Sequence, residues 1–123
     1  MIYTSYFGNI PNLKKLGIIP IAICEGLPED YNGKWYRKLA PSWSIYSQYK
    51  ETGKCDVYIN RYINEILNKL NSQIVYSNLC NLAGRKYDFA LICYEKPRQF
   101  CHRHLVCNWL NQNNIPCQES NNT

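Results

Sequence analysis

The chain has 123 residues and a formal net charge of +5, with 46% hydrophobic and 19% charged residues. That length fits one domain, and this composition excludes wholesale disorder. The longest apolar stretch, IIPIAIC at residues 18–24, is too short to span a bilayer. The N-terminus lacks the pattern of an export signal, so we expect a cytoplasmic protein without membrane contact. The excess of positive charge favours an anionic partner, either a phosphorylated small molecule or nucleic acid.

Cysteine and tyrosine are both frequent. The seven cysteines are an odd number and are scattered along the chain, so we expect reduced thiols that mostly belong to the core. Tyrosine, present eleven times, combines a flat apolar ring with a polar tip. It therefore suits both a small core and stacking on nucleic-acid bases, and the core explanation is favoured for most of the eleven.

The first third of the chain alternates strand and helix. Residues Ile2–Phe7 form a predicted strand, and Pro11–Leu16 form a short helix that Asn9 begins and Gly17 ends. The continuous apolar run Ile18–Cys24 is typical of a strand covered on both faces. The glycine- and proline-containing stretch from residue 25 to residue 40 is a long loop, and a loop of that length inside a compact domain is often functional.

The remaining two thirds continue this alternation. Helices are predicted at Ser42–Lys50, Ser72–Leu82 and Cys101–Asn111, and Ile74 is among the inward positions of the second of these. A further helix is predicted to begin with a cap at Asp56, and its apolar positions at helical spacing are Ile59, Ile63, Ile66, Leu67 and Leu70. Strands are predicted at Tyr87–Tyr94 and, as an edge strand, at Ile115–Gln118. Strands separated by helices imply a mainly parallel sheet. We therefore predict an α/β fold, a small Rossmann-like sandwich with three to four strands flanked by helices. Residues 1–118 form its single domain and residues 119–123 a polar C-terminal tail.

The connection after the strand Tyr87–Tyr94 concentrates reactive side chains. Glu95 lies at the carboxyl end of that strand, where parallel sheets bind ligands. The helix that starts near Cys101 offers an anion seat, to which Lys96 and Arg103 add positive charge. The same field favours a thiolate at Cys101. Glu95, Cys101 and His102 are therefore the candidate catalytic residues. The alternative is structural, with Cys101 in the core and Glu95 paired with Arg103 to hold the connection.

A metal reading of the same region stays open. Cys93, Cys101, His102 and Cys107 are chemically suited to zinc, but their spacing matches no compact zinc finger. No cofactor is expected, and structural zinc is the alternative.

The segments CYEKPRQFCHRHLVCNWLN, GKWYRKLAPSW and MIYTSYFGN resemble the bacterial and phage domain-of-unknown-function 488 family. The likeness is to a short single-domain branch with a CYEKP-x-x-FCHRHLV signature, and it extends from Ile2 to about Gln118. It implies a Rossmann-like domain and nominates as signature positions Cys93, Glu95, Cys101, His102 and Arg103. Broader members carry an Asp-x-Arg pattern after the second strand, where this chain has Ile-Cys-Glu at residues 23–25. The role of that pair is therefore not transferred.

The resemblance also makes residues 33–41 a candidate wall of the crevice. Lys34, Tyr36 and Arg37 would be ligand contacts there, and the alternative is that this stretch only packs as a lid. Tyr3 and Tyr6 are further candidates to line the crevice or stack on a ligand.

Three functions follow from these residues. The first is hydrolysis of a glycosidic or phosphoester bond in a nucleotide-like or otherwise phosphorylated small molecule, whose anion Arg103 holds. The second is non-catalytic capture of such a nucleotide signal in phage–host conflict. The third is nucleic-acid binding through the basic surface, although no recognised docking motif is present. The sequence leaves the oligomeric state open.

Overall fold

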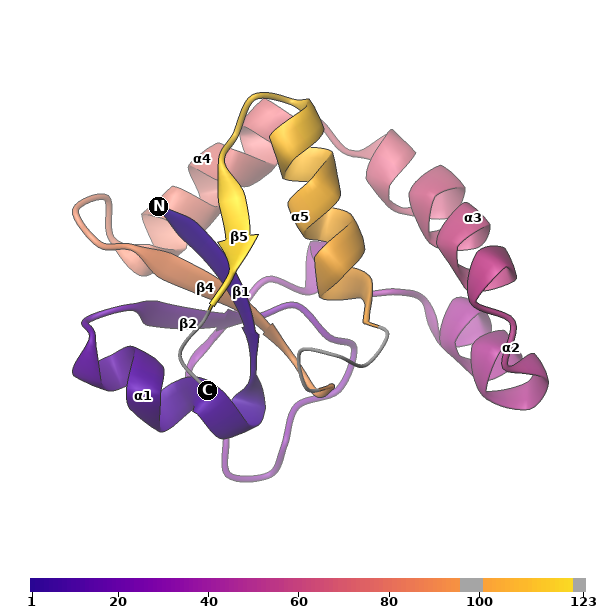
Figure 1. Ribbon diagram of the computed structural model, residues 1–123, viewed down its shortest axis with the longest axis horizontal. Helices are drawn as coiled ribbons and strands as arrows, with labels where there is room; N and C mark the ends of the chain where they lie inside the picture. The colour runs from indigo at the N-terminus through magenta and orange to yellow at the C-terminus, as the bar shows by residue number, and fades with distance from the viewer. Residues whose placement is uncertain (96–100, 121–123) are drawn as a thin grey trace.

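The computed structural model describes residues 1–95 and 101–120, which contain one five-stranded parallel sheet (Figure 1). The strands are β1 (Ile2–Tyr6), β2 (Ile19–Ala22), β3 (Lys34–Trp35), β4 (Phe89–Cys93) and β5 (Cys117–Glu119), in the spatial order β3-β2-β4-β1-β5. All neighbouring strands run parallel. This confirms the predicted α/β sandwich. The sheet exceeds the predicted strand number because β3 lies inside the stretch that was predicted to be a loop.

Helices cover both faces of this sheet. They are α1 (Ile10–Lys15), α2 (Trp43–Thr52), α3 (Cys55–Glu65), α4 (Ser72–Ala83) and α5 (His102–Gln112), with short 3-10 turns at Phe7–Asn9, Arg37–Leu39 and Leu67–Lys69. Helix α1 packs on one face, and α4 and α5 pack on the other, while α2 and α3 form a hairpin beside α5 and away from the sheet (Figure 1). Among the described helices, none combines the length and the apolar character needed to cross a membrane.

Strand β4 explains why the chain has a continuous apolar run before the reactive connection. All five of its residues are buried. Phe89 and Leu91 join the core under α4 and α5, while Ala90 and Ile92 pack against the α1 side. A central parallel strand is covered on both faces, so its sequence is apolar at every position. The residues that follow Cys93 therefore start from a fixed position at the edge of the sheet.

Two of the five α-helices, α2 and α4, begin with a side-chain cap. The Ser42 side chain accepts a bond from the Ile45 backbone N–H, and Asn71 caps α4 in the same way. The predicted cap of α3 is wrong, because Lys54 occupies the N-cap position and Asp56 lies in the first turn. A carboxylate in that turn is still favoured by the helix dipole.

The buried face of two helices also differs from the prediction. In α3 the buried residues are Tyr58 and Tyr62, one position before the predicted Ile59 and Ile63, which are half-buried. Ile74 was predicted to face inward on α4, but its side chain is 61% exposed. The aromatic residues at i and i+4 have more apolar surface to bury than the isoleucines beside them, and they set the rotation of α3.

The C-terminal residues join the sheet. Glu119 pairs with Thr4 in the β1–β5 ladder, and the Ser120 backbone N–H donates to the Thr4 carbonyl. The prediction assigned residues 119 and 120 to the polar tail. Their attachment matters because it brings Glu119 to Arg103 at the start of α5.

Candidate functional site

A pocket of about 440 Å³ opens beyond the carboxyl ends of β2 and β4. Its lining residues are Cys24, Glu25, Gly26, Pro41, Trp43, Tyr46, Tyr49, Lys50, Tyr58, Cys93, Tyr94, Glu95, Cys101 and His102. Ala22 of β2 and Ile92 of β4 are register partners. Glu25 and Glu95 each lie three residues beyond this register pair, so both carboxylates come to this pocket. Ligands bind at this edge of open parallel sheets.

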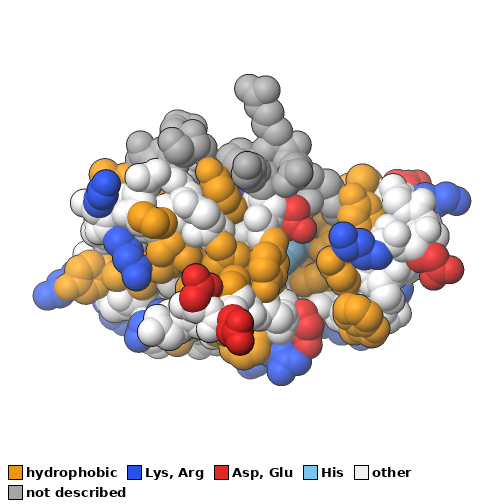
Figure 2. Space-filling view, turned by 90° about the horizontal axis from the view of Figure 1, so that it is seen from below, with side chains coloured by type: hydrophobic (Ala, Val, Ile, Leu, Met, Phe, Trp, Pro, Cys, Tyr) orange, Lys and Arg blue, Asp and Glu red, His pale blue; other side chains and the backbone are white. Residues whose placement is uncertain are grey.

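The wall opposite the strand ends is aromatic and comes from the α2–α3 hairpin. The Trp43 and Tyr46 ring centroids lie 5.8 Å apart, and Tyr49 and Tyr58 meet edge to face at 5.4 Å. The Lys50 Nζ lies 5.6 Å from the Tyr46 ring centroid. Hydrophobic side chains gather on this face of the molecule, with acidic side chains among them (Figure 2). The wall therefore offers flat apolar surface with one cation beside it.

Glu25 is held in its ionised form. The Arg37 guanidinium donates to both of its carboxylate oxygens. This hydrogen bonding lowers the pKa of Glu25 from its ordinary value. Arg37 itself lies over the Trp35 ring at 5.4 Å and does not line the pocket. Arg37 was predicted to contact a ligand directly. In the structure it instead contacts Glu25, which lines the pocket.

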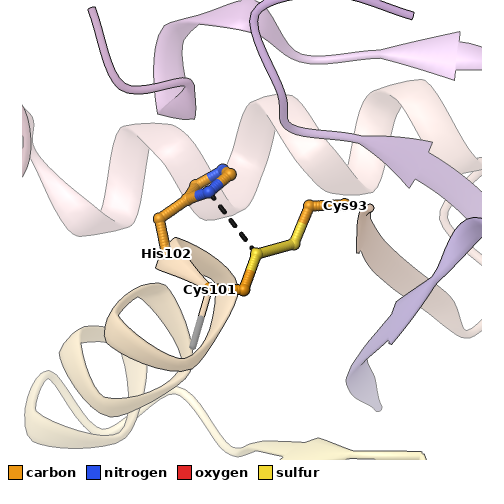
Figure 3. Close-up of side chains that lie close together, drawn as sticks. All are labelled: Cys93, Cys101 and His102. Carbon is orange, nitrogen blue, oxygen red and sulfur yellow. Dashed lines mark hydrogen bonds between the residues drawn. A yellow bond between two sulfur atoms is a disulfide. The ribbon is translucent and has the colours of Figure 1, made fainter. Parts of the chain in front are cut away.

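His102 occupies the buried floor of the pocket in a defined tautomer. Its Nε2 lies 2.6 Å from the Ile23 carbonyl oxygen. Because a carbonyl can only accept, Nε2 carries the proton and Nδ1 keeps its lone pair. Burial is the main cause that lowers the pKa of His102 to about 4, so the ring is neutral near pH 7. Nδ1 faces the Cys101 Sγ at 3.7 Å (Figure 3).

The structure joins Cys93 and Cys101 in a disulfide, contrary to the expectation of free thiols. Cys93 ends β4, and Cys101 is the N-cap residue of α5, so the return of the chain brings the two sulfurs together. Cys101 was predicted to be a thiolate nucleophile. In the disulfide state this residue has no free thiol, and a nucleophilic role requires its reduction.

Arg103 was predicted to hold a ligand anion, and the structure places it elsewhere. Its side chain is 0% exposed, and its Nε and NH2 groups donate to the two Glu119 carboxylate oxygens at 3.1 and 3.0 Å. The remaining NH1 group donates to the Cys93 Sγ and to the Glu95 backbone carbonyl. Arg103 therefore ties α5 to β5 and to the end of β4. This matches the structural alternative, except that Glu119 supplies the carboxylate.

Four other predicted contacts are absent from the pocket lining, namely Tyr3, Tyr6, Lys34 and Tyr36. Tyr3 is half-buried against the α1 side of the core, and Tyr6 lies beside Gly8. Lys34 is exposed on β3, and the buried Tyr36 accepts a bond at its hydroxyl from Asn78. Lys96 lies outside the described residues.

The aromatic α2–α3 wall and Glu25 line the pocket but were not predicted from the sequence as site residues. The signal for the wall was present, because Trp43, Tyr46 and Tyr49 recur at every third position of one predicted helix. Residues at that spacing share one helix face. The signal for Glu25 was its position directly after a predicted buried strand, the same argument that singled out Glu95.

Comparison with known proteins gives one match. A family model described as the active DUF488-N3 subclade matches residues 18–114, a range that spans β2 to α5 and includes the whole pocket lining. The match confirms the resemblance that the sequence segments indicated. No curated protein and no solved structure matches the chain.

Proposed function

The chain belongs to the active DUF488-N3 subclade, and from this membership together with its two pocket carboxylates we propose that it hydrolyses the glycosidic bond of a nucleotide-like small molecule. The observation that carries the proposal is the placement of Glu25 and Glu95 at neighbouring strand ends, opposite an aromatic wall. Paired carboxylates are the usual catalytic groups of glycosidic-bond hydrolysis.

The pocket fits a nucleoside or mononucleotide. Its volume of about 440 Å³ lies within the range typical of small-ligand sites. A planar nucleobase stacks favourably on aromatic rings, and Trp43, Tyr46 and Tyr49 supply them. Arg103 is paired with Glu119. Among the described residues of the lining, Lys50 therefore supplies the positive charge that suits a phosphate.

The two carboxylates take different parts in the proposed reaction. Glu25, kept ionised by Arg37, accepts the proton of the attacking water and stabilises positive charge that develops on the sugar. Glu95 acts as the general acid and gives a proton to the departing nucleobase as the glycosidic bond breaks. The water oxygen bonds to the anomeric carbon, so the products are a free base and a sugar or sugar phosphate. Arg37 acts through Glu25 as a positioning residue.

Non-catalytic capture of the same ligand uses the same pocket, and it is the competing function. The family description as an active subclade favours turnover. A nucleic-acid partner has less support, because the described residues of the pocket lining include a single cation, Lys50, and the aromatic wall encloses a small volume.

Incubation with a panel of nucleosides and nucleotides, followed by chromatography of free bases, tests the proposal. The wild-type chain should release a base, and Glu95→Gln should slow release by at least about a hundredfold, as removal of a general acid–base group does. Glu29→Gln is the matched control, since Glu29 is exposed and outside the pocket lining. Recovery of an unaltered bound nucleotide would assign the capture function instead. Equal turnover in wild type and Glu95→Gln would reject the assigned role of Glu95.

A further inference from the structure

Three potential metal ligands converge at the floor of the pocket. The ligand atoms of Cys93, Cys101 and His102 all lie within 4.8 Å of one another, and all three residues are buried (Figure 3). They come from the end of β4 and the start of α5. This cluster differs from the zinc set considered from the sequence, because Cys107 instead contacts Cys117 and Asn111.

The histidine is already oriented as a ligand. The bond from Nε2–H to the Ile23 carbonyl leaves the Nδ1 lone pair directed at the cysteine sulfurs. Metal-binding histidines commonly donate their other ring N–H to a backbone carbonyl, which fixes the tautomer and the ring plane. Neither the hydrogen bond nor the ring has to change for Nδ1 to coordinate an ion.

The distances fit a tetrahedral ion. At tetrahedral angles, with the usual zinc–ligand bond lengths, a sulfur and a nitrogen on one Zn²⁺ lie about 3.6 Å apart and two sulfurs about 3.8 Å apart. The Cys101 Sγ and the His102 Nδ1 lie 3.7 Å apart. The Cα atoms of Cys93 and Cys101 are 7.4 Å apart, so the two sulfurs can separate to the tetrahedral spacing once the bond between them is reduced.

The charge environment suits two thiolates and a divalent cation. The Arg103 NH1 donates to the Cys93 Sγ at 3.2 Å, and a donor of this kind stabilises a thiolate. Two thiolates and a neutral imidazole balance the charge of Zn²⁺, so the buried site carries no net charge. Cys24, the other cysteine of the lining, donates its S–H to the Gly26 carbonyl and is outside the cluster.

We propose that the reduced chain binds one Zn²⁺ through Cys93 Sγ, Cys101 Sγ and His102 Nδ1, with the fourth position open to the pocket. A dithiol reductant supplies the two electrons that convert the disulfide to two thiols, and Zn²⁺ binding then releases the two thiol protons. The disulfide form has no thiolate to offer, so oxidation and metal binding exclude each other. Zinc sites with three protein ligands keep a position for water or substrate. The inference does not rest on the proposed hydrolysis.

Titration of the reduced chain with Co²⁺, a spectroscopic substitute for zinc, tests the site. We expect saturation at one equivalent, with the strong d–d absorption of a tetrahedral ion and a thiolate charge-transfer band, and displacement of both by Zn²⁺. Cys93→Ser, Cys101→Ser and His102→Gln should each lose this spectrum. The matched controls Cys55→Ser, exposed, and Cys107→Ser, half-buried, should keep it.

The oxidised wild-type chain is a control that does not depend on the folding of any variant. It should bind no Co²⁺, and reduction should restore binding. Peptide mapping after alkylation should show Zn²⁺ protecting Cys93 and Cys101 but not Cys55. An octahedral Co²⁺ spectrum, equal binding by oxidised and reduced chains, or absence of protection at the two cysteines would overturn the proposal.

Discussion

Replacing Glu119 by alanine should destabilise the protein strongly, because it leaves a buried cation without its counter-ion. The Arg103 side chain is fully buried, and two of its nitrogen atoms donate to the Glu119 carboxylate. The same carboxylate accepts the Thr4 hydroxyl. Breaking one partner of a buried ion pair typically costs 3–5 kcal/mol in the free energy of unfolding, with about 3 kcal/mol expected here. The lower end applies because Glu119 is 25% exposed and water can enter the vacated space.

Urea unfolding followed by circular dichroism measures this loss, and thermal unfolding should show a fall of roughly 12 °C in Tm for a domain of this size. Glu65→Ala is the matched control, because Glu65 also pairs with an arginine, Arg61, but at the surface of α3. Its urea midpoint should barely move. The double variant Arg103→Met with Glu119→Leu should recover much of the stability, since an apolar pair leaves no buried charge. A Glu119→Ala midpoint equal to that of Glu65→Ala would refute the reasoning.

Two further measurements address a helix cap and a pocket thiol. Asn71→Ala removes the side-chain oxygen that accepts two backbone N–H groups at the start of α4. The free energy of unfolding, measured by urea titration, should fall by about 1 kcal/mol. An unchanged urea midpoint would contradict a stabilising role of this cap. Burial raises the pKa of Cys24 to about 11, so its alkylation should lag far behind that of the exposed Cys55 at pH 8 and rise about tenfold per pH unit up to pH 11. Equal rates at pH 8, read by mass spectrometry, would show that Cys24 is not shielded.

The parts of the fold that the sequence predicted well are those with an unambiguous pattern. Strands β2 and β4 are continuous apolar runs, and a run of that length reads as a strand covered on both faces. The carboxyl end of β4 and the start of the helix after it were the basis for proposing Glu95 and His102, and both residues line the pocket. The two-residue strand β3 escaped because its exposed residues, Lys34 and Trp35, carry no alternating pattern.

The partner of Arg103 could not be read from the sequence. A cation in the first turn of a helix needs an anion, and Glu95 or a ligand was the nearest candidate along the chain. The true partner, Glu119, belongs to β5, which follows α5 in the sequence, and it reaches the helix start because β5 pairs with β1. Long-range pairing of this kind depends on the order of strands, which local composition does not encode. The same limit hid the contribution of the α2–α3 hairpin to the pocket.

The α2–α3 hairpin also separates two groups of residues that line the pocket. Glu25, Glu95 and the sulfur-bearing residues of the lining come from the ends of β2 and β4 and from the start of α5, whereas the rings of the aromatic wall come from α2 and α3, which pack beside the sheet instead of on it. Substitutions among those rings can therefore change the shape of the pocket without moving the residues at the strand ends. Under the proposed function, related chains that share the strand ends but differ in the hairpin should act on different compounds.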